Sequence, residues 1–222
     1  MASQLQILLL SLKVASLATV AILPVGTYLG WLLSRKSFLG KSLLDGVVNF
    51  PLVLPPVVTG YFLLFLLGPQ GVVGQFLQRW FGFRLAFTWK AAAVAAAVVS
   101  LPLLVRSVRV AVDSVDAKLE EAARVLRASE WSIFVRITLP LAANGILAGS
   151  VLAFARGLGE FGATIVFASN IPGKTQTIPL AIFTYLNQPG GESKAQILVI
   201  ISMVVAYLSI LVNEWLLRKF KK

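Results

Sequence analysis

The sequence predicts an all-α integral membrane protein that forms a single domain over residues 1–222. Hydrophobic residues make up 58% of the chain and charged residues only 13%, whereas an ordinary globular domain carries about 25% charged residues. Five apolar segments are long enough to cross a bilayer, which takes about 20 residues of helix. Because no polar linker separates these segments, we expect one membrane domain with five transmembrane helices.

The five predicted spans follow one another along the chain. The first contains Lys13 and lacks the basic start and small-residue cleavage site of a signal peptide, so it is expected to be a span. Between the last two, residues 159–194 are expected to form half-helices and turns at the outer face, because an even number of crossings must separate two cytoplasmic ends. The predicted spans are residues 5–33, 43–67, 87–105, 137–157 and 195–217.

The basic residues predict the orientation of the spans, since Lys and Arg gather in cytoplasmic loops. With the N-terminus outside and the C-terminus in the cytoplasm, the outer loops and span edges hold only Arg79, Arg84, Lys90, Lys174 and Lys194. The net charge of +11 therefore indicates a membrane topology and not binding to nucleic acid. The inner loops and tail hold Arg35, Lys36, Lys41, Arg106, Arg109, Lys118, Arg124, Arg127, Arg136, Arg218, Lys219, Lys221 and Lys222.

The composition also excludes several kinds of chemistry. The chain has no cysteine and no histidine, so disulfides, thiol nucleophiles, zinc fingers and histidine catalysis are absent. The stretch "RKSFLGKS" ends like a phosphate-binding loop, but Arg35 stands where the first glycine of that motif is required. We therefore expect no catalytic residue, no metal site and no cofactor in this chain.

The second predicted span contains three prolines within "NFPLVLPPVVTG", followed by Thr59. Proline removes a backbone donor and kinks or breaks a helix, and in lipid the freed carbonyl groups need partners or a wet cavity. Two interpretations remain open at this point. The prolines Pro51, Pro55 and Pro56 form either a packing kink or a broken helix that lines a translocation path together with Thr59.

Pairs of small residues predict close contacts between helices. Gly26 and Gly30, and Gly145 and Gly149, each stand four residues apart. Such pairs let two membrane helices approach closely, so we expect both pairs to lie at helix–helix contacts.

Arg156 and Glu160 stand near the predicted outer end of the fourth span. Their i, i+4 spacing puts them on one helix face, and Gly162 follows closely. Ionisable residues beside lipid are functional candidates. Arg156 can attract an anion, but Glu160 would repel it, so we expect an ion pair that acts as a strut at an outer gate.

The longest polar stretch, residues 113–140, predicts two short helices between the third and fourth spans. Asp113, Ser114 and Asp116 are candidate N-caps, and Ser129 is a candidate cap for the second helix. The first helix has one apolar face by its i, i+3, i+4 spacing: Leu119, Ala122, Ala123 and Leu126. This helix either lies on the membrane surface or binds in a groove of a soluble partner.

The same stretch resembles the EAA loop of ABC transporter permeases. In that family Glu-Ala-Ala is followed by a glycine and then by Ile-x-Leu-Pro, between two spans on the cytoplasmic side. Arg127 replaces the usual glycine, so the break between the two short helices is expected to soften or to shift toward Ala128 and Ser129. The matching positions are Glu121, Ala122, Ala123, Arg127, Ile137, Leu139 and Pro140.

Further stretches narrow the resemblance to the permeases of molybdate importers. They are "FPLVLPPVVTGYFLL", "LAFARGLGEFGATIVFASNIPGKTQTIPLAIFT" and "PGGES". The permeases for tungstate and for sulfate or thiosulfate share the EAA loop and the "GEFG" element but match "SNIPGKTQTIP" less well. Molybdate is therefore the expected cargo, and these other oxyanions are the alternatives.

The resemblance implies a type I ABC importer permease fold in the bacterial cytoplasmic (inner) membrane, with a coupling segment at residues 113–140. It implies four kinds of partner: a second copy of the permease, two cytoplasmic ATPase subunits, an extracytoplasmic oxyanion-binding protein and the lipid bilayer. ATP hydrolysis would belong to the ATPase subunits and not to this chain. An ion-coupled secondary transporter is a weaker alternative, because the second and third spans carry no ionisable residue at their centres.

Overall fold

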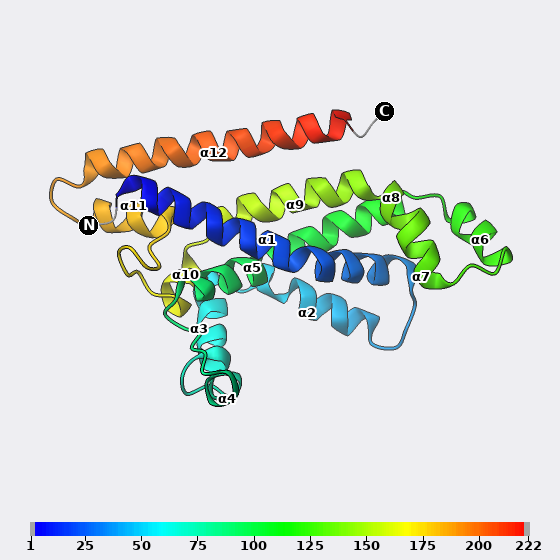
Figure 1. The fold of residues 1–222 in the computed structure, drawn as a ribbon, viewed down its shortest axis with the longest axis horizontal. Coiled ribbons are helices and arrows are strands. Elements are labelled where there is room, and N and C mark those ends of the chain that lie inside the picture. Colours follow the sequence, from blue (N-terminus) through cyan, green and yellow to red (C-terminus); the bar gives the residue numbers. More distant parts are fainter. Residues whose placement is uncertain (1–2, 220–222) are drawn as a thin grey trace.

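The computed structural model describes residues 3–219, and the regular structure in this range is helical. The long helices run side by side along the long axis of an elongated bundle (Figure 1). Shorter helices gather at its two ends and on one side. The elements are α1 (Gln4–Arg35), α2 (Lys41–Val53), α3 (Pro56–Leu67), α4 (Val72–Phe81), α5 (Trp89–Asp113), α6 (Ala117–Val125), α7 (Glu130–Ile133), a π-helical turn η1 (Phe134–Thr138), α8 (Leu139–Leu141), α9 (Ala143–Leu158), α10 (Gly162–Phe167), α11 (Ile178–Leu186) and α12 (Glu192–Lys219).

Three of these helices, α1, α5 and α12, are each long and apolar enough to cross a membrane, and two bent helix pairs raise the number to as many as five. The five predicted spans thus correspond in position to three continuous helices and two bent helix pairs. The third predicted span was too short, because α5 continues beyond residue 105 as far as Asp113. Arg106 and Arg109 thus lie within this helix and not in a loop.

The second predicted span is broken at its prolines, as the second of the two interpretations requires; that the break lines a translocation path stays a prediction. The axes of α2 and α3 differ by 115°, and Leu54 between them has extended backbone angles. Pro56 is the first residue of α3, where a missing N–H leaves no hydrogen bond unmade. The proline pair therefore ends one helix and begins the next.

The fourth predicted span is also bent. The helical run Glu130–Leu141 meets α9 at an angle of 73°, and Ala142 lies at the junction. The π-helical turn η1 precedes this bend. A π-helical turn often marks a functional position within a helix.

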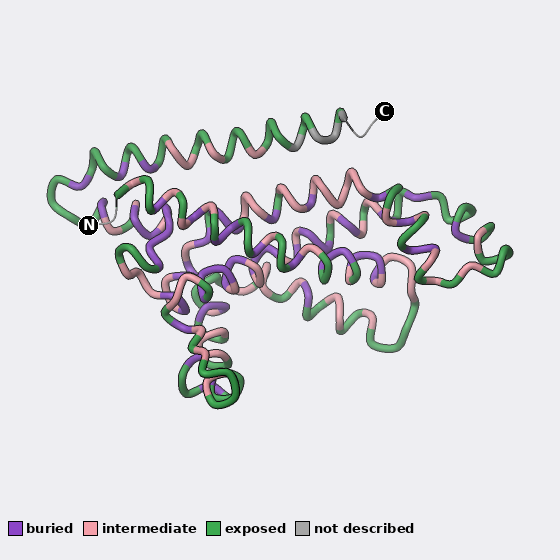
Figure 2. The backbone as a smooth tube through the Cα atoms, in the orientation of Figure 1, coloured by how far each residue is buried: buried purple, intermediate pink, exposed green. Residues whose placement is uncertain are grey.

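Helix α5 forms the centre of the bundle, with α1 and α9 against it. In its most apolar window 61% of the residues are buried, compared with 33% in α1 and 11% in α12, and buried residues gather along it (Figure 2). A Cβ added at Gly30 of α1 would lie 2.7 Å from Cβ of Val108, and one added at Gly149 of α9 would lie 2.7 Å from Cβ of Ser107. Both predicted glycine pairs are thus confirmed as close contacts with α5.

Residues 159–194 form two short helices, α10 and α11, joined by turns, as expected from the sequence. They lie at the end of the bundle near the N-terminus, whereas α6 and α7 lie at the opposite end (Figure 1). Helices α3 and α4 project sideways from the bundle. The sequence analysis did not anticipate α4, which ends at Gly82 in a left-handed conformation.

Candidate functional site

The 113–140 segment begins with a defined cap. The side chain of Asp116 accepts a hydrogen bond from the backbone N–H of Lys118 at 2.9 Å and starts α6. Asp113 is instead the last residue of α5, and its carboxylate accepts a hydrogen bond from the hydroxyl of Ser34. Ser114 caps the end of α5, where its hydroxyl donates to the carbonyl of Ala111. Of the three candidate N-caps, only Asp116 has that role.

The break between α6 and α7 covers residues 126–129, so it includes Ala128 and Ser129 as expected, and the left-handed turn itself is at Arg127. Arg127 has a φ of 59°, in the left-handed region. Its N–H donates to the carbonyl of Arg124 at 2.9 Å, and the N–H of Ala128 donates to the carbonyl of Ala123 at 3.0 Å. This pair of bonds is a Schellman motif, which usually has glycine where Arg127 stands. The two bonds hold a side-chain-bearing residue in a conformation that costs about 1–2 kcal/mol.

Ser129 caps the second short helix, as the sequence predicts. Its hydroxyl accepts a hydrogen bond from the N–H of Ser132 at 3.2 Å. A helix ended by a Schellman motif and another begun by a side-chain cap leave little freedom between them. The segment therefore consists of two short helices whose relative orientation is fixed by the turn between them.

The apolar face of α6 makes no contact with the rest of the described chain that buries it. The exposed fractions of Leu119, Val125 and Leu126 are 49%, 83% and 82%. Glu121 and Ala122 are exposed, and Ala123 is half-buried. We call this surface, formed by Leu119, Glu121, Ala122, Ala123, Val125 and Leu126, the α6 ledge. Exposed apolar side chains on one face of a helix are typical of a surface that meets either a partner protein or a membrane.

On the opposite side of α6, Glu120 is 2% exposed. Its carboxylate lies 3.0 Å from Nε of Arg35 and 3.7 Å from Nη2 of Arg124. The hydroxyl of Thr138 donates to the same carboxylate at 2.7 Å. Nη2 of Arg35 also donates to the carbonyl of Val115 at 2.7 Å. A buried carboxylate is tolerated when it is paired and hydrogen-bonded in this way.

The sequence analysis missed Glu120. Its neighbour Glu121 carries the family motif, whereas the main partner of Glu120 is 85 residues away in the chain. The one local signal was the i, i+4 spacing of Glu120 and Arg124. That spacing alone would not have shown that the carboxylate of Glu120 is buried.

A second, more exposed ion pair network joins α1 to α7. Oε2 of Glu130 lies 2.7 Å from Nζ of Lys36, and Oε1 lies 2.7 Å from Nε of Arg124. The hydrogen bonds from Arg124 and then from Lys36 lower the pKa of Glu130 to about 2, and the bond to Glu130 raises the pKa of Arg124. Glu130 therefore stays charged near neutral pH. The remaining motif residues lie beyond α7: Ile137 in η1, and Leu139 and Pro140 in α8.

Two of the path and gate candidates, Pro56 and Gly162, meet where α3 packs against α10. A Cβ added at Gly162 would lie 2.8 Å from Cβ of Pro56, and one added at Gly60 would lie 2.7 Å from the carbonyl oxygen of Ala163. Thr59 is 5% exposed, and its hydroxyl has no hydrogen-bond partner within the described part of the chain. Pro51 lies apart from this contact, inside α2.

Arg156 and Glu160 form the expected ion pair. Nη1 of Arg156 lies 2.7 Å from Oε2 of Glu160, whose side chain is 2% exposed. Oε1 of Glu160 also accepts a hydrogen bond from the N–H of Ala163 at 2.7 Å. The pair therefore holds the end of α9 to the start of α10, the helix against which α3 packs.

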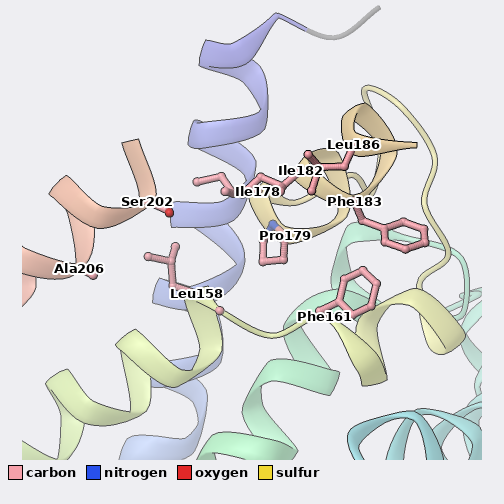
Figure 3. A pocket seen from close by; sticks show the side chains of 10 residues that line it. Leu158, Phe161, Ile178, Pro179, Ile182, Phe183, Leu186, Ser202 and Ala206 are labelled. Atoms are coloured by element: carbon pink, nitrogen blue, oxygen red, sulfur yellow. The ribbon is translucent and has the colours of Figure 1, made fainter. Parts of the chain in front are cut away.

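An apolar cavity of about 540 Å³ lies beside this region, between the end of α9, α11 and α12 (Figure 3). Of the described residues that line it, none carries a charge, so the cavity does not suit an oxyanion. Nor do residues 3–219 contain a cluster of three or more carboxylates that could hold a metal ion. The lining residues are Leu158, Gly159, Phe161, Ile178, Pro179, Ile182, Phe183, Leu186, Ser202 and Ala206.

Comparison with known proteins places this arrangement in a family. Residues 22–222 match the family described as "Binding-protein-dependent transport system inner membrane component", and the chain belongs to that family. It is accordingly a multi-pass protein of the cytoplasmic membrane. The fold is that of a type I ABC importer permease: the chain superposes on a solved structure of the MetNI methionine ABC transporter with a TM-score of 0.71 and 17% identity, covering 99% of this chain and 94% of that one.

Individual relatives are more similar in sequence. The chain is 57% identical to the molybdenum transport system permease protein ModB of Escherichia coli K12 and 49% identical to the protein of that name from Haemophilus influenzae. Each alignment covers 96% of this chain and 93% of the relative. The sulfate transport system permease protein CysT of Escherichia coli K12 is 35% identical, with 82% of this chain and 66% of that protein covered.

Proposed function

We propose that this protein is the permease subunit of an ATP-driven importer that takes up molybdate. The observation that carries this proposal is the 57% identity to a molybdenum permease over 96% of the chain. Sulfate or thiosulfate is the first alternative, supported by the 35% identity to a sulfate permease. Tungstate is the second, because it has nearly the same size and charge as molybdate.

The α6 ledge is the surface that an ATPase subunit would bind. It is largely apolar and exposed, and the segment that contains it also carries Lys118, Arg124, Arg127 and Arg136. The positive-inside rule puts that segment in the cytoplasm and the N-terminus outside. The ATPase subunit would hydrolyse ATP, and this chain would convert its movement into a change of the membrane path.

The transport path would form between two copies of the chain. A broken helix is tolerated at membrane depth where it lines a cavity or packs against protein, and the break between α2 and α3 meets that description. Val53 and Val57, on either side of the break, are 81% and 52% exposed. A second copy would cover this surface, and a binding protein would deliver the anion at the end that contains α10 and α11.

The proposal is tested in vesicles that contain the permease and its ATPase subunits, with the binding protein outside and ATP inside. We expect molybdate uptake that requires both ATP and the binding protein. Tungstate should compete, and sulfate should compete weakly. Uptake that follows an ion gradient without ATP would support the secondary transporter instead, and stronger uptake of sulfate than of molybdate would support the first alternative.

A further inference from the structure

Helix α1 contacts the 113–140 segment although the two are not consecutive in the chain: helices α2 to α5 lie between them. The segment continues directly into α5 at one end and into α9 at the other, so movement of the segment passes to those two helices through the chain. Helix α1 ends about 80 residues earlier. Any movement that it receives must pass through side-chain contacts.

Those contacts lie at three consecutive residues at the end of α1. Ser34 donates to Asp113 at the end of α5, Arg35 pairs with Glu120 in α6, and Lys36 pairs with Glu130 in α7. The three contacts join the end of α1 to the end of α5 and to both short helices. Of the two ion pairs, only Arg35–Glu120 is buried, with exposed fractions of 15% and 2%.

Aromatic rings reinforce the same junction. The ring centroids of Trp31 in α1 and Phe134 in η1 lie 4.8 Å apart, and those of Phe134 and Trp131 in α7 lie 5.5 Å apart. Tilted aromatic pairs at these distances are favourable. The ring contacts and the buried ion pair together resist separation and sliding of α1 against the segment.

At its other end α1 contacts α11. The hydroxyl of Ser11 accepts a hydrogen bond from the backbone N–H of Ile178, the first residue of α11, at 2.8 Å. Ser11 is 2% exposed, and Ile7 one turn earlier is 1% exposed. Ile7 belongs to a buried cluster that includes Ile178 and Ala181. Helix α1 is 32 residues long, which at about 1.5 Å per residue gives about 48 Å between its ends.

We propose that α1 is a rod that carries movement of the 113–140 segment to α11 at the opposite end of the bundle. Glu120 and Arg35 form its input joint, and Ser11 and the N–H of Ile178 form its output joint. The inference rests on the proposed function, because it assumes that an ATPase moves the segment. In this scheme α1 is a third helix that receives movement from the 113–140 segment, besides α5 and α9, which continue the chain on either side of it. Glu120 is a positioning residue in this scheme and does not contact the ATPase.

The test uses a reporter at α11 in the assembled permease–ATPase complex. The chain has no cysteine, so Leu186→Cys at the end of α11, 62% exposed, accepts a single environment-sensitive fluorophore. In the otherwise unaltered complex ATP should change the fluorescence. Glu120→Gln and Arg35→Gln should each remove most of that change while ATP hydrolysis continues. The ATP hydrolysed per molybdate imported should rise, because hydrolysis continues while its coupling to the membrane path is weakened.

Three further variants separate a joint from a general structural role. Glu120→Asp, which keeps the charge, should retain part of the ATP-dependent fluorescence change. The double variant Arg35→Gln with Glu120→Gln should lose no more of that change than either single variant, because the two residues act together. Asp45→Asn is the matched control: it breaks the 3.6 Å ion pair between Asp45 and Arg109 at the same end of the bundle and should leave the signal unchanged. If the Glu120 variants do not assemble, Ser11→Ala tests the output joint in the same way.

Two outcomes overturn the rod, and a third concerns only the proposed function. A full ATP-dependent signal in assembled Glu120→Gln or Ser11→Ala complexes contradicts the rod. So does equal loss of signal in Asp45→Asn. Absence of molybdate uptake by the unaltered complex contradicts the proposed function instead, and the ATP-dependent fluorescence still reports on the rod in that case.

Discussion

Gly162 in α10 lies directly against Pro56, the first residue of α3. A Cβ added at Gly162 would lie 2.8 Å from Cβ of Pro56 and 3.2 Å from the backbone nitrogen of Val57. Two segments that are more than 100 positions apart in the sequence thus meet at a site with no room for a side chain. The break in the second span is held in place by this contact.

The first prediction follows from that contact. Gly162→Val should push α3 away from α10, because neither backbone can move by a few tenths of an ångström without disturbing the bend. We expect loss of ATP-driven uptake, while the variant still inserts and still binds its ATPase subunit. Gly159→Ala is the control, since an added Cβ there meets only ordinary contacts at 3.8 Å. Normal uptake by Gly162→Val would show that this contact is dispensable.

The second prediction concerns the Arg156–Glu160 ion pair. Glu160→Gln keeps an oxygen that can accept the N–H of Ala163 but removes the charge, so it isolates the ion pair from the backbone hydrogen bond. Uptake should fall for Glu160→Gln and for Arg156→Gln, with little change in the half-saturation concentration of molybdate. The charge-swapped double variant Arg156→Glu with Glu160→Arg should recover only in part, because arginine cannot accept the N–H of Ala163.

The competing interpretation has a different signature. If Arg156 contacts the oxyanion, Arg156→Gln alone should raise the half-saturation concentration, and the charge swap should remain inactive in an assembled complex. Uptake rates measured over a range of molybdate concentrations distinguish the two interpretations.

The third prediction concerns Arg127. Glycine would relieve the left-handed conformation, which costs about 1–2 kcal/mol for other residues, but it also gains about 0.4–1 kcal/mol of entropy in the unfolded chain. Because the relief of strain is the larger of the two, Arg127→Gly should unfold at the same or a slightly higher temperature and retain uptake. Arg127→Val should lose binding to the ATPase, because a β-branched residue adopts positive φ very poorly. Equal behaviour of both variants in a co-purification assay would contradict this account.

The fourth prediction concerns the α6 ledge. Leu126→Asp and Glu121→Lys, which change exposed residues, and Ala123→Trp, which adds bulk at a half-buried one, should each reduce co-purification of the ATPase subunit and uptake. Lys118→Gln changes an exposed residue of α6 outside the ledge and should have little effect. If the three ledge variants bind the ATPase normally, α6 instead lies on the membrane surface.

The fifth prediction concerns the path. Single cysteines at Val53 and Val57, which the single chain leaves 81% and 52% exposed, should react with a charged thiol reagent, because the proposed path between the two copies would bring water to them. Thr59→Cys should be protected in the resting state, since Thr59 is 5% exposed, and should become reactive when ATP is added. Protection of Val53 and Val57 in every state would place the break in contact with lipid or protein and not beside the path.

The sequence allowed prediction of the features that depend on local patterns. Apolar length located the spans, the spacing of Gly26 and Gly30 predicted a helix contact, and Ser129 was recognised as a cap. Arg156 and Glu160 were paired correctly from their spacing of four residues, although Glu160 lies just beyond the end of α9. In each case the relevant information lay within a few residues.

Features that depend on distant contacts could not be predicted in this way. Arg127 stays left-handed because two backbone bonds around it outweigh its own preference, and no single residue encodes that balance. Glu120 is buried because Arg35 and Thr138 meet there, whereas the resemblance to the family motif drew attention to its neighbour Glu121. The 115° bend at Pro55 and Pro56 is fixed by packing against α10, so the prolines permit the break without setting its angle.

The sparse packing of α12 has a consequence for how the protein is made. This helix packs mainly on α9 and α11, and only 11% of its most apolar window is buried. Synthesis proceeds from the N-terminus, so α12 is the last of the described helices to leave the ribosome. The contacts among α1, α5 and α9 do not require it, and the inner bundle can assemble in the bilayer while the last span is still being translated.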